Sequence, residues 1–112
     1  MINRITKPWE SEYRIEKTEI VAETHNLRVL DITLSEGQFV PWHYHSKITD
    51  IFFCITGELQ IETKNYKTII HPGESYQIIA NVPHRVSNKS NSNCKFLLVQ
   101  GIGAYDYIKT ME

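Results

Sequence analysis

Hydrophobic and polar residues alternate with a period of two over short stretches along most of the chain. In residues 26–34 (NLRVLDITL), the even positions from Arg28 to Leu34 form one set and the odd positions from Leu27 form the other, as in a half-buried strand. Further runs rich in β-branched and aromatic residues lie at 18–23, 50–55, 59–63, 66–70, 75–80 and 94–99.

Turn residues separate these runs. Thr56-Gly57, Lys64-Asn65 and Pro72-Gly73 each fall between two of them. Strands that recur about every 8 to 12 residues, with turns between them, are typical of a β-sandwich or barrel. No segment carries an apolar stripe at helical spacing for more than about two turns. The pattern therefore predicts an all-β protein.

The length of 112 residues fits one domain. We expect a single domain over residues 1–112, with its barrel core at residues 25–100. Residues 1–17 are polar, and their pattern fits a short helix, an N-terminal arm or an edge strand. Because short strands with exposed edges are protected by pairing, the early strand at 18–23 gives a weak indication of a homodimer.

Composition and charge narrow the classes of function. The chain is 41% hydrophobic and 22% charged, which suits a globular protein with a buried core. The net charge is −1 and the basic residues are spread singly, which argues against a nucleic-acid partner. The longest uncharged apolar run, residues 51–57, is too short to span a membrane, and residues 1–20 lack the apolar core of a secretion signal. We therefore expect a cytoplasmic protein without a membrane partner.

The two cysteines, Cys54 and Cys94, lie far apart inside apolar runs. Redox pairs and thiolate metal clusters need closer or more numerous cysteines. We therefore expect two buried thiols that pack as small hydrophobic side chains.

The histidines hold the candidate chemistry. His43 and His45 are two residues apart, so on a strand both imidazoles point to the same face. Asp50 follows after a short connection that would suit an antiparallel hairpin, and His84 follows Pro83 at the start of another apolar stretch. Three imidazoles and a carboxylate suit Fe(II), Mn, Ni, Zn or Cu(II). Spacing alone leaves open that the histidines are only partly buried polar residues.

Residues 37–57 (GQFVPWHYHSKITDIFFCITG) resemble the first cupin motif, G-x5-H-x-H-x4-E-x6-G. Every spacing is kept, and Asp50 stands in the place of the motif's Glu. The second motif, P-x-G-x2-H-x3-N, matches at His84 and Asn88, whereas Ile79 and Asn81 replace its Pro and Gly. Asn adopts the left-handed conformation more readily than most residues, so the turn at Asn81 is expected to survive the change.

The resemblance implies an antiparallel jelly-roll barrel, the double-stranded β-helix of cupins, usually built as a homodimer. It also implies a divalent transition metal, Fe, Mn, Ni or Zn, held by His43, His45 and His84. Asp50 is about 1.5 Å shorter in reach than Glu. It therefore has several roles open: a direct fourth ligand, a ligand through water, a general base, or none in a three-histidine site. Such a site would leave open positions for a chelating substrate and dioxygen.

Parity along the strands predicts which other side chains reach the interior. If Asp50 faces inward, so do Phe52 and Cys54, and an outward Lys95 turns Phe96, Leu98 and Gln100 inward. A buried amide needs a partner, so Gln100 is a candidate for supporting the metal site or binding substrate. The predicted substrate pocket consists of Phe52, Tyr76 and Gln100.

Other residues have simpler expected roles. Arg85 should point away from the face of His84. We expect His25 and His71 to be surface histidines. Large aromatics on the outer face are enriched at interfaces, and the candidates for a dimer contact are Trp9, Trp42 and Tyr44.

Three functions remain open at this point. The first is a metalloenzyme, a dioxygenase, isomerase or lyase, acting on a small organic molecule. The second is a non-catalytic module that binds or senses a small ligand, since fold does not set function. The third is a metal-stabilised structural protein, which is favoured if the barrel is filled by Phe39, Phe52, Phe53 and Phe96.

Overall fold

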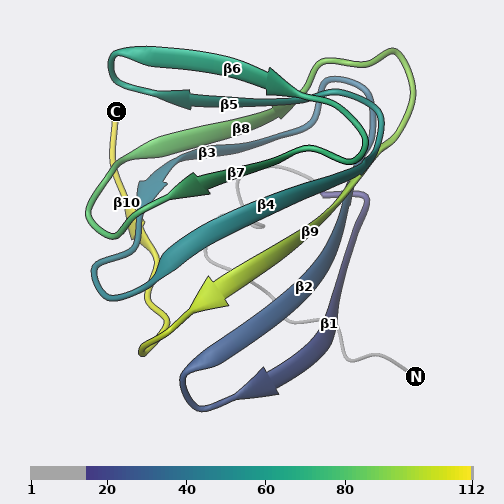
Figure 1. Ribbon diagram of the computed structural model, residues 1–112. Coiled ribbons are helices and arrows are strands. Elements are labelled where there is room, and N and C mark those ends of the chain that lie inside the picture. The colour runs from purple at the N-terminus through teal and green to yellow at the C-terminus, as the bar shows by residue number, and fades with distance from the viewer. Residues whose placement is uncertain (1–14, 112) are drawn as a thin grey trace.

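The computed structural model describes residues 15–111, and in this range the chain forms strands joined by short connections, without a helix (Figure 1). The strands are β1 (Lys17–Thr24), β2 (Leu27–Leu34), β3 (Phe39–Tyr44), β4 (Thr49–Thr56), β5 (Leu59–Thr63), β6 (Tyr66–Ile70), β7 (Ser75–Ile78), β8 (His84–Asn88), β9 (Cys94–Gly101) and β10 (Ile108–Lys109). The all-β prediction is confirmed, and the early run at 18–23 lies in β1.

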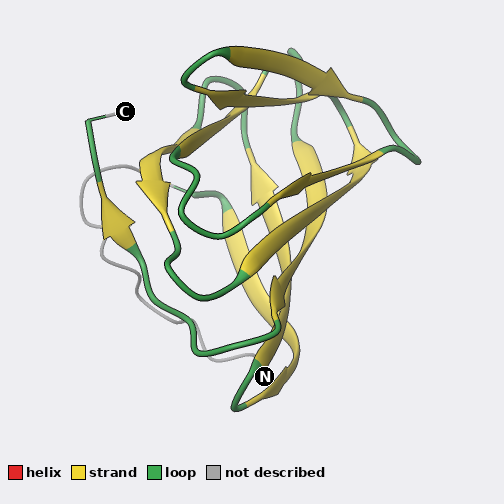
Figure 2. Ribbon diagram, turned by 60° about the vertical axis from the view of Figure 1, so that its left-hand side comes forward, coloured by secondary structure: helices red, strands yellow, loops and turns green. Residues whose placement is uncertain are grey.

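Two antiparallel sheets enclose the interior (Figure 2). The strand order is β1-β2-β9-β4-β7 in the first sheet and β10-β3-β8-β5-β6 in the second. The chain crosses between the sheets several times, as in a jelly roll, so neighbouring strands in a sheet are often distant in sequence. This arrangement is the double-stranded β-helix that the motif resemblance implied. β1 lies at the edge of the first sheet, where a second chain could pair with it. The homodimer stays a prediction.

The alternating pattern explains which side chains form the core. Along β2 and β9 every second residue is buried, and the two strands pair in register from Leu27 with Gly101 to Leu34 with Cys94. Cys54 and Cys94 are buried free thiols, as predicted, and burial raises the pKa of Cys94 to about 12. The main apolar side chains of the core are Leu30, Ile32, Leu34, Phe52, Cys54, Leu59, Ile61, Val86, Cys94, Phe96 and Leu98.

Two of the four phenylalanines contribute to this core. Phe52 and Phe96 are buried with their ring centroids 6.0 Å apart, as the parity argument predicted. Phe53 is 41% exposed, and Phe39 lies half-buried with the Arg85 guanidinium 4.5 Å above its ring. The interior is therefore not filled by all four rings, which was the condition that favoured a purely structural protein.

Gly57 follows β4 at a place where only glycine fits. Its φ is +83°, and a Cβ there would lie 2.9 Å from the Cα of Cys94. The glycine of the first motif thus permits the close approach of the β4–β5 turn to the start of β9.

The arm predicted at residues 1–17 and the dimer candidate Trp9 fall mostly outside the described residues. Ile15 and Glu16 precede β1 without regular structure, and Lys17 begins that strand. In residues 15–111, no helix offers a stretch long and apolar enough to cross a membrane.

Candidate metal centre

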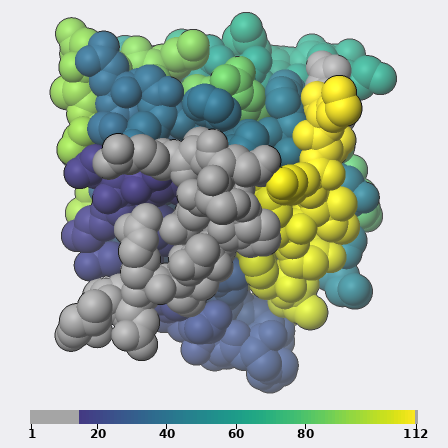
Figure 3. Space-filling model, turned by 180° about the vertical axis from the view of Figure 1, so that it is seen from behind, coloured from purple at the N-terminus to yellow at the C-terminus, as the bar shows by residue number. Residues whose placement is uncertain are grey.

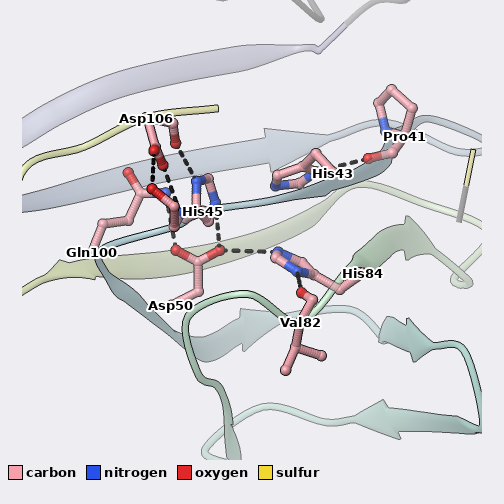
Figure 4. Close-up of polar contacts among 9 residues, drawn as sticks. Pro41, His43, His45, Asp50, Val82, His84, Gln100 and Asp106 are labelled. Carbon is pink, nitrogen blue, oxygen red and sulfur yellow. Dashed lines mark hydrogen bonds and ion pairs between the residues drawn. The ribbon is translucent and has the colours of Figure 1, made fainter. Parts of the chain in front are cut away.

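Four buried side chains from both sheets meet in the interior (Figure 4). His43 lies in β3, His45 directly follows that strand, His84 begins β8, and Asp50 lies in β4 of the opposite sheet. One donor atom from each residue lies within 4.8 Å of the donors of the others. The four predicted ligands are therefore brought together, in a donor set that can bind a metal ion.

Strand pairing and one turn position the three histidines. His43 and His84 are direct partners in the antiparallel pairing of β3 with β8. The turn before β8 contains Asn81, which has a φ of 68° and is the one described non-glycine residue with a positive φ. Its backbone N–H donates to the carbonyl oxygen of His45 at 2.7 Å. Asn81 therefore keeps the left-handed turn that the second motif builds with glycine.

The expected hairpin between the histidines and Asp50 is wrong. β3 and β4 belong to different sheets, so the short connection after His45 passes from one sheet to the other instead of turning back along the same sheet. Asp50 consequently faces the histidines across the barrel. A crossing connection brings the donors together around a point in the interior, which a flat hairpin face would not do.

Each metal-site histidine is oriented by a backbone carbonyl. The Nδ1 atoms lie 2.8 Å from the Pro41 oxygen for His43, 2.5 Å from the Asp106 oxygen for His45, and 2.9 Å from the Val82 oxygen for His84. A carbonyl only accepts hydrogen bonds, so each Nδ1 carries a proton. In the neutral rings the lone pairs therefore lie on Nε2, on the opposite side of each imidazole from its carbonyl.

The Asp50 carboxylate faces two of these Nε2 atoms. Its Oδ2 lies 3.1 Å from Nε2 of His45 and 3.1 Å from Nε2 of His84, while Gln100 Nε2 donates to its Oδ1 at 3.0 Å. Asp50 is 1% exposed. Lone pairs that face a buried carboxylate repel it unless a proton or a metal cation lies between them. The residues present thus fit a divalent cation.

The electrostatics of the cluster set its protonation. Burial, together with the nearby His84 and His45, lowers the pKa of His43 to about 3. Burial alone would lower the pKa of His45, but its contact with the Asp50 carboxylate outweighs this and raises it. Although burial works in the other direction, the two histidines hold the pKa of Asp50 well below its usual range. His43 is therefore neutral and Asp50 ionised throughout the physiological range.

The metal-free protein is expected to be most stable near pH 6.5. Below that pH the unfolded chain protonates His43 and the folded chain does not, so stability falls by about 1.4 kcal/mol per pH unit. Above it, the contribution of His45, whose pKa is raised by folding, is lost as pH rises through the folded value. Urea unfolding of chelator-treated protein between pH 4.5 and 8 measures both limbs. His43→Asn should flatten the acid limb, and an unchanged acid limb in that variant would contradict the assignment.

A cavity adjoins the cluster. It has a volume of about 20 Å³, enough for roughly one water molecule or one ion, and is lined mostly by apolar side chains. Phe52 and Gln100 line it, as predicted. Tyr76 does not: it pairs with Phe52 in the sheet but stacks on Tyr66, with ring centroids 6.2 Å apart. The contact of Tyr76 thus joins the edge strands β7 and β6.

An open cleft of about 540 Å³ lies beside this cavity, a volume typical of small-molecule sites. Gln100 and Tyr105 line both the cavity and the cleft, so they form the wall between the two. The cleft is completed by Glu23, Thr24, His25, Leu27, Arg28 and Gly103.

The segment after β9 supplies site residues that sequence reasoning missed. It crosses to the second sheet, where β10 pairs with β3, and it lies along the side of the molecule opposite the view of Figure 1 (yellow in Figure 3). Besides orienting His45 through its carbonyl, Asp106 accepts hydrogen bonds from the backbone N–H of Ser46 at 2.8 Å and from the Ser46 hydroxyl. Tyr107 stacks on His43 with ring centroids 4.4 Å apart. The one signal in the sequence was the Tyr105-Asp106-Tyr107 triplet beyond the last strong strand pattern.

The remaining predicted residues lie where simple roles place them. His71 is exposed between Glu58 and Glu74, and His25 is exposed at the rim of the cleft. Arg85 points away from the cluster of histidines and Asp50 toward Glu62, as parity predicted.

Fold and site together define a jelly-roll protein with a buried cluster of three histidines and one aspartate that can bind a metal. The cupin domain family model (Cupin_2) matches residues 30–100, and the chain belongs to the cupin family. No curated protein matches the sequence.

Solved structures share the fold at low identity. A double-stranded β-helix protein from Klebsiella pneumoniae is 20% identical, with 96% of this chain and 99% of that chain covered and a TM-score of 0.75. KdgF from Halomonas sp. is 16% identical, with 82% and 90% covered and a TM-score of 0.71. A chain from the DMSP lyases RdDddP and RnDddQII is 18% identical, with 97% of this chain and 62% of that chain covered and a TM-score of 0.79.

Proposed function

We propose that this cupin is a metal-dependent enzyme that acts on a small organic molecule. His43, His45, His84 and Asp50 would hold a divalent transition metal, Fe, Mn, Ni or Zn. The observation that carries the proposal is the orientation of the three imidazoles, since each Nδ1 is fixed by a backbone carbonyl. That arrangement prepares the Nε2 lone pairs for a cation. One structural neighbour is a chain from the crystal structures of DMSP lyases, which is compatible with catalysis here.

The bound metal would act as a Lewis acid on an oxygen of the substrate. The chain's own residues prepare this chemistry by excluding water and fixing the donors. Apolar walls that include Phe52 and Phe96 surround the cavity beside the cluster. Gln100 holds Asp50 through its Oδ1. A dry environment strengthens the electrostatic effect of a bound cation.

Asp50 is better placed as a ligand than as a general base. Its Oδ2 lies 3.1 Å from each of two imidazole nitrogens and its Oδ1 accepts from Gln100, so the Oδ2 edge faces the point where a metal shared with these histidines would lie. Although Asp is shorter than the Glu of the motif, β4 brings this carboxylate to the histidines. We therefore assign Asp50 as the fourth ligand.

The size of the inner cavity favours a second candidate function. A volume of about 20 Å³ holds a metal ion without an organic molecule beside it. A cupin that binds a metal and a ligand in the outer cleft, without turnover, fits this observation. Turnover is the property that separates the two candidates.

Elemental analysis of tag-free protein, purified without added metal or chelator, tests the proposal. We expect close to one equivalent of Fe, Mn, Ni or Zn per chain. The loaded protein is then screened with small hydroxy and oxo acids for dioxygen consumption, elimination and isomerisation. Less than about a tenth of an equivalent, even after soaking with each metal, would overturn the metal site. Full loading without turnover would favour the binding module.

A further inference from the structure

A row of polar side chains crosses the first sheet from the metal cluster to the open cleft. Arg28 of β2 pairs directly with Gln100 of β9, and Gln100 pairs on its other side with Asp50 of β4. Directly paired residues of an antiparallel sheet point to the same face. All three therefore face inward, and they are 7%, 4% and 1% exposed, respectively.

Arg28 is a buried cation without a complete set of partners. Neither its Nε nor its Nη2 has a hydrogen-bond partner among the described residues, and both atoms are buried. Glu23 Oε2 is 3.7 Å from Nε, beyond hydrogen-bonding distance. A buried guanidinium with unpaired N–H groups is costly unless an anion completes it. Because Arg28 lines the cleft, a ligand bound there is placed to supply that anion.

Tyr105 fixes the orientation of this guanidinium. The Arg28 Cζ lies 4.0 Å from the centroid of the Tyr105 ring, so the aromatic face covers the guanidinium carbon. The edge of the guanidinium carries its N–H donors, and a planar fork of this kind matches the two oxygens of a carboxylate. Tyr105 also forms part of the wall between the cleft and the metal cavity.

Gln100 offers the complementary group nearer the metal cluster. Its Nε2 donates to Asp50, and its Oε1 is buried with no hydrogen-bond partner among the described residues. A carbonyl oxygen pairs only with a donor, such as a hydroxyl. The row therefore presents a donor fork at Arg28 and an acceptor at Gln100. Adjacent strands lie about 4.8 Å apart, so the two groups match a molecule of a few carbon atoms.

We propose that the cleft binds a small hydroxy carboxylic acid, with its carboxylate on Arg28 and its hydroxyl donating to Gln100 Oε1. The inference deepens the proposed function and rests on it for the role of the metal. It gives the substrate class of that site, since a molecule bound along this row points toward Asp50. The neutral amide of the same acid would lose the charge that Arg28 recognises.

Titration calorimetry with glycolate, lactate and malate tests this assignment, and the amide of each acid serves as its uncharged counterpart. We expect at least one acid to bind the wild-type protein, its amide to bind at least tenfold more weakly, and the affinity of the acid to fall with salt. Arg28→Gln should weaken that acid at least tenfold, with Arg28→Lys in between. The matched control is Arg85→Gln, because Arg85 also lies over an aromatic ring and beside a glutamate but lines neither the cleft nor the cavity.

Metal content and melting temperature are recorded for each variant, and the titrations are repeated on chelator-treated protein. Binding that depends on Arg28 in protein that never takes up metal would overturn the proposed enzyme and leave the carboxylate site standing. Absence of binding by every acid overturns the inference, and so does equal binding of an acid and its amide. Since the amide comparison uses the wild-type protein, it decides the question even if Arg28→Gln fails to fold.

Discussion

Replacing His45 with alanine is expected to remove the bound metal and any activity together. His45 supplies one of three imidazole nitrogens, and its Nε2 lies 3.1 Å from Asp50 Oδ2 in the buried cluster. Changes to residues that merely support a metal ligand cost about 10- to 100-fold in affinity, so loss of the ligand itself should cost more than about 100-fold. Elemental analysis after dialysis, followed by a competition titration with a chelating dye, measures the change.

His71→Ala is the matched control for this variant. His71 is exposed, forms ion pairs with Glu58 and Glu74 and is not part of the buried cluster, so its loss should leave metal content unchanged. The Nδ1–H of His45 also donates to the carbonyl oxygen of Asp106, and His45→Gln tests whether a polar side chain preserves the fold when alanine does not. A His45→Ala protein that retains one equivalent of metal would refute the site.

The gathering of the four candidate ligands could be predicted from local spacing together with the resemblance to the two cupin motifs. Two residues along a strand restore the same face, which placed His43 beside His45, and the two motifs fixed Asp50 and His84 relative to them. The same parity placed Phe52 and Gln100 inward. The geometry between the strands could not be obtained this way. A short connection fits both a hairpin and a crossing between sheets, and tertiary packing chose the crossing.

Sequence reasoning missed the site residues at positions 105–107 for a different reason. Asp106 contacts His45 and Ser46 across about 60 positions of sequence, and no spacing rule connects residues at that separation. The path of the chain after β9 decides the contact. The positions of Tyr105 and Tyr107 depend on the same path, since both residues lie beside Asp106 in the segment that joins β9 to β10.

Arg28 is a candidate binding residue that the alternating pattern of residues 26–34 already contained and that sequence reasoning overlooked. The alternation in residues 26–34 places Arg28 on the same face as Leu30 and Ile32, and the structure buries all three. A charged residue on an otherwise apolar face needs a partner, which is the physical mark of a binding group. The strand register relates Arg28 to the candidate metal cluster, because Arg28 pairs with Gln100 and Gln100 pairs with Asp50.

Removal of the metal is expected to lower the melting temperature by roughly 10 °C at neutral pH. A ligand that binds only the folded chain at a hundredfold excess over Kd contributes about 2.7 kcal/mol. For a domain of 112 residues this corresponds to roughly 10 °C. Calorimetry with and without a chelator measures the difference. The His45→Ala protein is the control, since a chain that binds no metal should melt at the same temperature in both buffers.

The difference in melting temperature with and without chelator should shrink toward pH 5, and the pKa of His45 sets the pH at which it shrinks. The metal competes with the proton that the Asp50 carboxylate favours on His45, whose pKa is raised, so affinity falls as pH drops below that pKa. His43, with a pKa lowered to about 3, stays neutral and does not compete over this range. The chelator effect should therefore be large at pH 7.5 and small at pH 5. A melting temperature that does not change with chelator at either pH value would show that the cluster holds no metal. Protons alone would then lie between the histidine lone pairs and the Asp50 carboxylate.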